Sequence, residues 1–498
     1  MRTLRWLALL ALAVPAVAAI PAVAAFGAVD ASWSQYQRDA GRSGLAPEGT
    51  PEPPYTVSWN APAGIGDPSK VLGSPAPILT DGLAVVVGRE TVEAIDISTG
   101  EQAWSVPRAL GPSAPAAVEG DTLVFVEGGG DGSTASASSS PTPPITPSAT
   151  PSKHATSPST AVSASVSSVV GMSLRTQRRL WSVPLSDVSN TGVLIAGSDV
   201  VVGADDGAIT ALDLDGRTRW TKDVGDHVLA PIAASGDLII ASVRPEAQGS
   251  AALVALRLAD GSQAWRYEPN GAVLDLGGPS VGSDASGSPT VYVVGVDASV
   301  RAVSVADGSQ RWAAPLYSPT TGSPPALTDD AVVVTDESGT VYDLDRATGS
   351  ERWRFATNRR SVDPPIVTGA SVIQPAADGA VSAISLGSGH EIWHGTIADS
   401  GVLGLAAARG LIVASVTGTA PGIVGLVSNP AGLTEDVVSP TTADPRGLVA
   451  NWLGAALPLT VLLIVIGQAL ATRMGPVSFD TADDDAVDPW EADLEDEP

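Results

Sequence analysis

One stretch of the sequence matches a known metal-binding pattern in both residue type and spacing. His390, Glu391 and His394 form H-E-x-x-H, in which two imidazoles bind one zinc ion and the glutamate acts as a general base. The pattern works only on a helix, where positions i and i+4 share a face. Here it follows a turn at 387–389 and includes Trp393, as a strand would. On a strand the two histidine Cα atoms would lie about 13 Å apart, so we predict no zinc site.

The remaining candidates for chemistry are acidic turns and isolated histidines. Residues 205–207 (Asp-Asp-Gly) and 378–379 (Asp-Gly) resemble calcium loops, but they lack the ligand spacing of an EF-hand and suit hairpin turns. His154 and His227 each stand alone, and we expect them in loops or on the surface. The sequence contains no P-loop. We therefore predict no catalytic, cofactor-binding or metal-binding residue.

These segments are embedded in a sequence that repeats. From Trp104 onward, successive repeat tryptophans lie 77, 39, 45, 47, 41 and 40 residues apart. A glycine precedes each by four positions, except that Gln177 replaces it before Trp181. A period near 40 residues is typical of propeller blades or solenoid units. The turn glycines are Gly100, Gly216, Gly261, Gly308, Gly349 and Gly389, and the repeat tryptophans are Trp59, Trp104, Trp181, Trp220, Trp265, Trp312, Trp353 and Trp393.

Each repeat contains about four short strands. In the first repeat, residues 91–97 alternate in polarity, meet an Asp/Ser/Thr/Gly turn and lead into a second extended run that ends at Trp104. Glycine allows the positive φ that such a tight turn needs. Another β-branched run, 83–87, lies upstream. This is the strand content of one propeller blade, and the large tryptophan is expected at the seam between neighbouring blades.

The two ends of the repeat region complement each other. Trp59 lies 45 residues before Trp104 without a complete repeat in front of it. Residues 402–406, 410–416 and 422–427 have the pattern of three strands that lack a tryptophan strand. We predict that the segment around Trp59 pairs with them and closes the ring, which removes exposed sheet edges. The predicted fold is all-β, an eight-bladed propeller of four-stranded blades over residues 33–430.

The repeat resembles that of the pyrroloquinoline-quinone-like (PQQ-like) propellers. Residues 94–104 match the pattern A-x-D-x-x-T-G-x-x-x-W in full, and residues 33–44 are similar to the opening segment of such chains. The resemblance implies a propeller fold but several functions, because one fold hosts many. The family includes quinoprotein alcohol dehydrogenases, the scaffold lipoprotein of outer-membrane β-barrel assembly, and sensor domains of membrane kinases. Partial matches occur at 255–265, 302–312, 343–353 and 383–393.

The absence of cysteine helps to choose among the functions found in this family. The resemblance implies that a quinoprotein dehydrogenase would hold its quinone against a disulfide of adjacent cysteines, with calcium nearby. This sequence has no cysteine, and no Glu/Asn/Asp calcium set maps onto it. It also lacks the lipid-bearing cysteine of the barrel-assembly lipoprotein. We therefore expect a non-catalytic scaffold or sensor that binds no cofactor, with a PQQ-dependent oxidoreductase of atypical site as the alternative.

The chain ends indicate a membrane protein. Residues 1–28 have the pattern of a signal peptide or an N-terminal anchor, with an uncharged stretch at 6–20 and small residues at 22–24. After a linker at 431–447, the uncharged run 448–472 is long enough for one transmembrane helix. We expect a single-pass plasma-membrane protein with the propeller outside the cytoplasm and the tail, 473–498, inside.

Charge narrows the partners. The formal net charge is -27, and nucleic acid is a poor partner for so acidic a chain because binding it needs basic patches. The tail after Arg473 contains acidic residues but no basic ones, so it suits either a basic partner or a solvated role. We expect an envelope or membrane protein as partner, and attachment to the membrane through the C-terminal helix.

One region departs from the repeat. Residues 128–168 are almost wholly Gly, Ser, Thr, Pro and Ala, and they account for the 77-residue interval. Such a segment cannot bury a core. We predict a disordered insert in blade 2 that suits O-glycosylation, and we expect deletion of 129–165 to leave the fold intact. Gln177 in the same repeat predicts a less regular hairpin.

Overall fold

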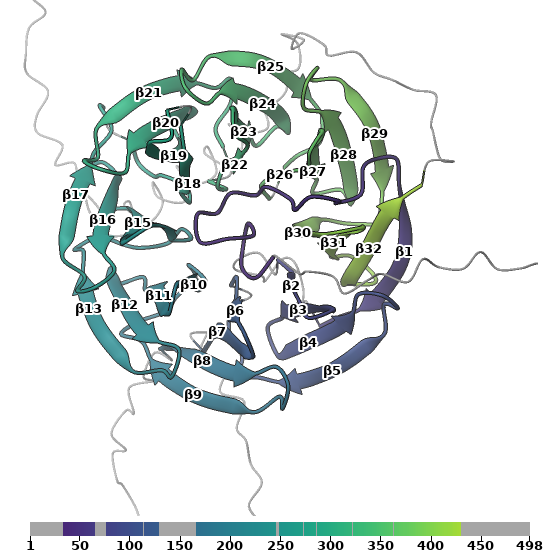
Figure 1. Cartoon of the computed structure of the whole chain (residues 1–498), viewed down its shortest axis with the longest axis horizontal. Coiled ribbons are helices and arrows are strands. Elements are labelled where there is room, and N and C mark those ends of the chain that lie inside the picture. Colours follow the sequence, from purple (N-terminus) through teal and green to yellow (C-terminus); the bar gives the residue numbers. More distant parts are fainter. Residues whose placement is uncertain are drawn as a thin grey trace, which may run out of the picture. The chain divides into compact units, whose positions relative to one another are not determined.

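The computed structural model describes residues 33–64, 76–112, 114–128, 166–245, 249–271, 273–284, 286–320, 322–361 and 363–429. These residues belong to the first of two compact units of the chain, Met1–Pro440. They contain 32 strands in eight four-stranded sheets, which form the ring in Figure 1. The innermost strands of successive sheets contact one another from β2 to β26, and β30 contacts β27 of blade 7 and β2 of blade 1. The ring is therefore closed, and the predicted all-β, eight-bladed propeller is confirmed.

Each blade is described from its innermost to its outermost strand. Blade 1 is β2 (Ile78–Thr80), β3 (Leu83–Val87), β4 (Thr91–Asp96) and β5 (Gln102–Pro107). Blade 2 is β6 (Ala117–Glu119), β7 (Thr122–Gly128), β8 (Ser167–Ser173) and β9 (Arg179–Pro184). Blade 3 is β10 (Leu194–Ala196), β11 (Asp199–Gly203), β12 (Ala208–Asp213) and β13 (Thr218–Asp223). Blade 4 is β14 (Ala233–Ser235), β15 (Leu238–Val243), β16 (Ala252–Arg257) and β17 (Gln263–Tyr267).

The second half of the ring is built in the same way. Blade 5 is β18 (Ser280–Ser283), β19 (Pro289–Gly295), β20 (Ser299–Ser304) and β21 (Gln310–Pro315). Blade 6 is β22 (Ala326–Leu327), β23 (Ala331–Thr335), β24 (Thr340–Asp345) and β25 (Glu351–Ala356). Blade 7 is β26 (Ile366–Val367), β27 (Ser371–Pro375), β28 (Ala380–Ser385) and β29 (Glu391–Thr396). Blade 8 is β30 (Val402–Ala408), β31 (Leu411–Val416), β32 (Gly422–Ser428) and β1 (Tyr55–Pro62).

Blade 8 confirms the predicted closure. Its outer strand, β1, comes from the N-terminal part of the repeat region. It pairs antiparallel with β32, from Tyr55 opposite Ser428 to Pro62 opposite Gly422. Trp59 lies on β1, as the other repeat tryptophans lie on the outer strands of their blades. Each blade thus contributes one tryptophan at the rim.

A small residue lies opposite nearly every repeat tryptophan on the neighbouring strand. The partner is alanine in five blades, as for Trp104 opposite Ala94. It is Gly171 opposite Trp181 in blade 2. A Cβ on Gly171 would lie only 2.2 Å from the Trp181 ring, because the indole folds over its partner. This packing explains the alanine that begins the repeat pattern.

The turn glycines pack against the tryptophan of the preceding blade. Gly216, at φ 80°, lies under the Trp181 ring, where an added Cβ would come within 2.5 Å. The tryptophan also bonds across the seam, since Trp181 Nε1 donates to the Leu214 carbonyl at 2.8 Å. The same packing recurs at Gly100 on Trp59 and Gly261 on Trp220. The glycine and tryptophan of the repeat therefore join adjacent blades.

Gln177 keeps the backbone of the turn glycines. It adopts φ 53°, and the register shift in its hairpin falls opposite Trp181, at the position where other blades have theirs. Its side-chain Nε2 donates to the Leu174 carbonyl at 2.9 Å. The expectation of a less regular hairpin was wrong, because the side-chain amide supports the left-handed conformation that glycine would supply.

The axis of the ring is filled by residues 33–50, which we call the axial segment. Figure 1 shows it running through the middle of the ring before it reaches β1. Inner-strand amides donate to its carbonyls in turn, including Leu79 to Trp33 at 3.0 Å and Val281 to Gly41 at 2.6 Å. Further bonds of this kind join Val118 to Ser34, Ala234 to Ala40, Leu327 to Ser43 and Val367 to Gly44. In blade 8 the amide of Gly410, in the turn after β30, donates to the Gly49 carbonyl.

Several sequence predictions lie outside the described residues. These are the signal segment 1–28, the linker 431–447, the transmembrane helix 448–472 and the tail 473–498. Across the part of the chain that the structure describes, no helix has the length and apolar character to span a membrane. Of the predicted insert 128–168, Gly128 ends β7 and residues 167–168 begin β8, whereas 129–165 lie outside the described residues.

Candidate functional site

The ring has two faces that carry different loops. The turn face carries the turns after the first and third strands of each blade, for example 97–101 in blade 1. The connection face carries the turns after the second strands and the connections between blades, for example 185–193. The turn face repeats nearly the same sequence around the ring, whereas the connections vary in length and composition. Loops of this second kind are where propellers and other scaffolds usually place function.

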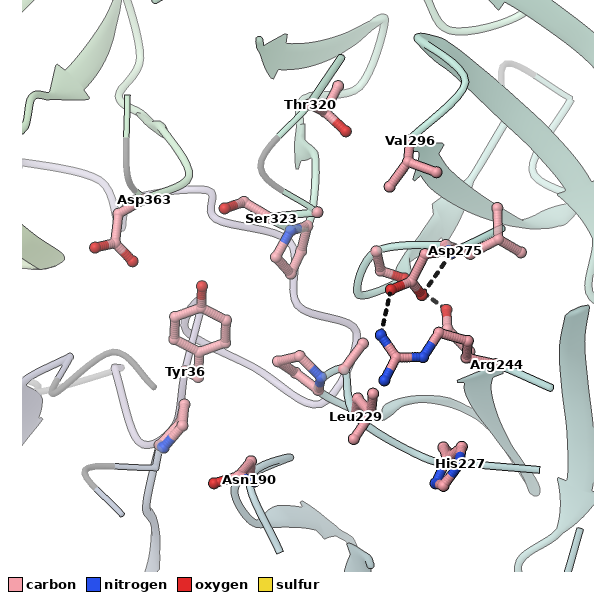
Figure 2. A pocket seen from close by; sticks show the side chains of 18 of the residues that line it. Tyr36, Asn190, His227, Leu229, Arg244, Asp275, Val296, Thr320, Ser323 and Asp363 are labelled. Atoms are coloured by element: carbon pink, nitrogen blue, oxygen red, sulfur yellow. Dashed lines mark hydrogen bonds and ion pairs between the residues drawn. The ribbon is translucent and has the colours of Figure 1, made fainter. Parts of the chain in front are cut away.

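A pocket of about 670 Å³ opens on the connection face beside the axis (Figure 2). We call it the connection-face pocket. The connections between successive blades from 1 to 7 supply most of its wall, and Tyr36 of the axial segment supplies part of it. Its size suits a small ligand or a few side chains. The lining residues are Tyr36, Pro115, Asn190, His227, Leu229, Ala230, Pro231, Ser242, Arg244, Asp275, Leu276, Gly277, Val296, Thr320, Gly322, Ser323, Pro324, Glu337, Asp363 and Leu403.

Tyr36 and Asp363 form the side of the pocket nearest the axis. Both are buried, at 7% and 4% exposure. Burial raises the pKa of Tyr36 well above its usual value, the Asp363 carboxylate raises it further, and Arg42 opposes them. The tyrosine therefore stays a neutral hydrogen-bonding group at any physiological pH.

Arg42 holds the axial segment in place behind Tyr36. Its guanidinium is fully buried and donates to three backbone carbonyls, those of Ile232 at 3.0 Å, Tyr36 at 2.9 Å and Val193 at 3.1 Å. Burial lowers the pKa of Arg42 to about 10, so the side chain remains charged at neutral pH. The fork geometry of arginine is what allows one side chain to bind carbonyls from two blades and from its own segment.

An ion pair forms the opposite side of the pocket. Arg244 Nη1 lies 3.3 Å from Asp275 Oδ2, and Figure 2 shows the pair facing the pocket. The backbone of Arg244 pairs with that of His227, whose Nδ1 lies 3.2 Å from Asp205 Oδ1. Asp275 also accepts from the Leu276 amide at 2.9 Å. The arginine and its aspartate are thus held by neighbouring backbone.

Two polar atoms in the pocket have no hydrogen-bond partner. Thr320 is only 4% exposed and its Oγ1 is unpartnered, although its backbone pairs with Asp336. Asn190 is half-buried and its Oδ1 is also unpartnered. Buried polar atoms are nearly always hydrogen-bonded in folded proteins. Both atoms are almost completely shielded from solvent, so a ligand could reach them only after the pocket wall had moved.

The axis and the pocket do not fit pyrroloquinoline quinone, the cofactor that the PQQ-like resemblance implies. The axial segment fills the centre of the ring, where Trp33 and Arg42 are 0% exposed. The pocket beside it presents Asp275, Glu337 and Asp363 to a cofactor that is itself a polycarboxylate. Within the described residues, no three His, Cys, Asp or Glu side chains lie close enough together to bind a metal ion.

The zinc-like motif leads into a strand, as predicted, and its first residue, His390, directly precedes that strand. Glu391 begins β29, and His394 is on the same strand. Glu391 is buried while His394 is exposed, and His394 Nδ1 lies 3.3 Å from Glu391 Oε2. Of the isolated histidines, His154 lies outside the described residues, and His227 lines the connection-face pocket. The acidic turns at 205–207 and 378–379 are hairpin turns between strands.

The repeat pattern in the sequence indicates neither the pocket nor the axial packing. The pocket draws on connections that share no motif, and the repeat pattern covers only the outer hairpins. One signal was present, because prolines precede several inner strands, as at Pro115, Pro231 and Pro365. Their regular position marks the connections that meet near the axis.

An eight-bladed ring of four-stranded blades joined by tryptophan and glycine seams is the architecture expected of a PQQ-like β-propeller. The sequence family described as "Outer membrane protein assembly factor BamB" matches residues 56–140, 165–324 and 296–429. These matches cover more than half of the chain, and the chain belongs to this family. The resemblance to PQQ-like propellers is thereby confirmed.

Part of the chain is similar to part of a protein kinase. It is 31% identical to the serine/threonine-protein kinase AfsK of Streptomyces griseus over 203 residues, which are 38% of this chain and 24% of the kinase. The match thus spans about a quarter of that relative's length.

Two solved structures show the same fold. BamB from Moraxella catarrhalis has a TM-score of 0.54 and 17% identity, and the match covers 75% of this chain and 100% of that chain. Quinohemoprotein alcohol dehydrogenase from Comamonas testosteroni has a TM-score of 0.59 and 11% identity, covering 83% of this chain and 82% of that chain. At these identities the likeness concerns the fold alone.

Proposed function

We propose that this chain is a non-catalytic protein-interaction scaffold or sensor of the cell envelope, anchored in the membrane, which binds its partner on the connection face. The propeller would lie outside the cytoplasm and the acidic tail inside. In this proposal the partner is an envelope or membrane protein.

The observation that carries the proposal is the filled axis. Residues 33–50 occupy the centre of the ring through hydrogen bonds to the inner strands, and Arg42 is fully buried there. The axis thus offers no chamber for a cofactor, and the connection-face pocket is an accessible concave surface beside it. Concave pockets with a few convergent polar groups are the usual binding sites of proteins.

The envelope location is supported by the sequence and by the family. The apolar stretch at 6–20 suits an export signal, and the run 448–472 suits a membrane span. The family description names an outer-membrane assembly factor, and AfsK is a protein kinase. Both descriptions are compatible with a propeller that acts by binding another protein.

A PQQ-dependent oxidoreductase is the second candidate, supported by the fold shared with quinohemoprotein alcohol dehydrogenase. It requires space for the quinone that the axial segment occupies. Purified protein incubated with pyrroloquinoline quinone and calcium should show neither retained quinone absorbance nor dye-linked alcohol oxidation. Turnover above a protein-free control would favour the oxidoreductase.

Site-specific photocross-linking in native membranes tests the scaffold proposal. A photoreactive residue replaces Val296, which is 41% exposed at the pocket, and the matched control replaces Asp237 on the turn face, which is 81% exposed. We expect a defined protein adduct from position 296 and not from 237. Absence of protein adducts from both positions would contradict the scaffold role.

A further inference from the structure

Exposed apolar side chains lie on neighbouring loops of the connection face, from blade 4 to blade 6. They are Leu274, Val296 and Tyr317, which together we call the apolar strip. Leu274 is 70% exposed and Tyr317 is 55% exposed. Seven large apolar side chains are exposed within the described residues, and the other four lie apart, in blades 2, 7 and 8. Adjacent exposed apolar groups of this kind are typical of protein-binding surfaces.

Backbone hydrogen bonds hold the loops of the apolar strip side by side. The Val296 amide donates to the Asp275 carbonyl at 3.2 Å, next to Leu274 in the chain. The Leu316 amide donates to the Ala298 carbonyl at 2.7 Å, directly before Tyr317. The three side chains are therefore presented by one continuous piece of surface.

Tyr317 is held in place although its ring is exposed. Its amide donates to the Tyr342 hydroxyl at 3.2 Å, and the Arg354 guanidinium lies 4.0 Å from its ring centroid. Tyr317 also lines a hollow of about 570 Å³ at the rim, where Ala313 and Ala314 follow the repeat tryptophan of blade 5. Blades 4 and 6 have arginine and then a large aromatic residue at these two positions. The small alanines leave room beside the strip for an apolar side chain of a ligand.

Carboxylates flank the apolar strip on both sides. On the blade 6 side, Glu337 is exposed, and its amide donates to the Pro319 carbonyl at 2.9 Å. Glu337 forms no ion pair with another described residue. On the blade 4 side, Arg266 pairs with Asp226 at 2.8 Å and with Glu268 at 3.0 Å, so one guanidinium serves two carboxylates. Each side of the strip thus carries one negative charge in excess.

Three arginines beside the strip are each paired with one carboxylate, so they add little net charge. Anionic groups, including phospholipid headgroups, would therefore meet the excess carboxylates and be repelled, whereas basic side chains would be attracted. This charge pattern favours a basic protein segment over a lipid surface. The three pairs are Arg244 with Asp275, Arg301 with Asp297 and Arg354 with Glu351.

We propose that the apolar strip binds a segment of the partner protein in which apolar residues are flanked on both sides by lysine or arginine. The apolar side chains of the segment cover the strip, and its basic residues pair with Glu337 and Glu268. Burial of the apolar groups supplies affinity, and the charges fix the register of the segment on the strip. This inference rests on the proposed scaffold function and states the chemistry of the partner.

Binding of short peptides to the full-length protein in phosphatidylcholine nanodiscs tests the inference. The probe is the blocked peptide Gly-Lys-Leu-Phe-Leu-Lys-Gly, measured by calorimetry with empty nanodiscs as the blank. Glu replaces both Lys in one comparison peptide, and Ser replaces both Leu and the Phe in the other. We expect the probe to bind and each comparison peptide to bind at least about tenfold more weakly, because one loses the charge attraction and the other the apolar area.

Variants of the strip locate the binding. Leu274→Ser and Tyr317→Ser should each weaken the probe about three- to tenfold. Glu337→Gln should weaken it about two- to fivefold, less so at high salt. Leu180→Ser is the matched control, because Leu180 is 54% exposed on the outer strand of blade 2, and it should change nothing. Thermal unfolding checks each variant, and Leu274→Ser carries the test if Tyr317→Ser does not fold.

A single-cysteine label distinguishes a protein partner from a lipid surface. The chain has no cysteine of its own, so Leu274→Cys can carry one environment-sensitive dye. We expect this dye to emit as in water in nanodiscs of phosphatidylcholine and of phosphatidylglycerol, as the same dye on Leu180→Cys does. A blue shift at position 274 alone would mean that lipid covers the strip and would overturn the inference.

Three further outcomes overturn the inference. They are the absence of probe binding at millimolar concentration, equal binding of either comparison peptide, and affinity that is unchanged in the strip variants. Protein adducts from position 296 combined with any of these outcomes would leave the scaffold function standing and exclude the basic, apolar segment. Failure of the cross-linking itself would instead contradict the scaffold function.

Discussion

The rim and the axis of this propeller are held together in opposite ways. At the rim the same contact recurs from blade to blade, with a turn glycine under the preceding tryptophan, as in Gly216 on Trp181. At the axis one continuous segment bonds, each time through a different residue, to the inner strands of blades 1 to 7 and to the turn after the inner strand of blade 8. Within it, Arg42 donates to carbonyls 151 and 190 positions away. Repeated contacts hold the ring together. The axial segment and the connections between blades do not repeat, and they form the part of the surface that differs from blade to blade.

The largest expected effect comes from removing the hydrogen bonds that hold the axial segment in the ring. Arg42→Met leaves three buried carbonyls without their donor, and we expect it to destabilise the propeller by about 3 to 5 kcal/mol. Arg257→Met on the turn face is the control, because Arg257 is half-exposed and 3.8 Å from Asp237. It should cost no more than about 1 kcal/mol. Chemical denaturation measures both, and similar losses would contradict a special role for the axis.

A glycine pair tests the rim. Gly216→Ala places a methyl within 2.5 Å of the Trp181 ring, whereas Gly236→Ala meets no atom within 4 Å, and both glycines have positive φ. The backbone strain is therefore common to both variants. We expect Gly216→Ala to cost about 1 to 3 kcal/mol more than Gly236→Ala in the free energy of unfolding. Equal costs would mean that the seam does not depend on this packing.

One rim position departs from the repeat and adds a pH dependence. Asp343 lies opposite Trp353, where most blades have alanine, and burial raises its pKa to about 6 although Arg352 opposes the shift. Because the folded-state pKa exceeds the unfolded value, the folded state binds more protons between about pH 4 and 6, and stability falls as pH rises through that window.

Asp343→Asn should remove this part of the pH dependence. We expect the loss of stability between pH 4 and 6 to shrink by about 1 to 2 kcal/mol relative to the parent protein. Denaturation at several pH values measures it. If the free energy of unfolding of the variant changed with pH as steeply as that of the parent protein, Asp343 would not titrate in this range.

The smallest effect is expected at Gln177, where the rim lacks its glycine. Gln177→Gly relieves a side chain at φ 53° but loses the amide bond to Leu174. The two terms nearly cancel, and we expect a gain of about 0.5 kcal/mol. A loss above about 1 kcal/mol would mean that the amide bonds determine the turn.

The rim could be predicted from sequence because its contacts repeat at a fixed spacing. The spacing of glycine and tryptophan predicted the positions of the blades. The three strands at 402–427, which lack a tryptophan strand of their own, indicated that the strand containing Trp59 closes the ring. The axis could not be predicted, because Trp33 and Arg42 have no periodic counterparts and their partners lie far away in the chain. The pocket was hidden for the same reason, since Asn190 and Thr320 come from connections that share no pattern.

Hydrogen exchange of the full-length protein tests the central claim, that the chain fills its own axis. The amide of Ala46 donates to Val367, and those of Val281 and Leu327 donate to the axial segment. The account predicts that peptides covering 33–50 exchange as slowly as the buried strand β31, which opens only on global unfolding. Exchange of 33–50 at the rate of exposed loops would contradict it and would leave the axis open to a ligand.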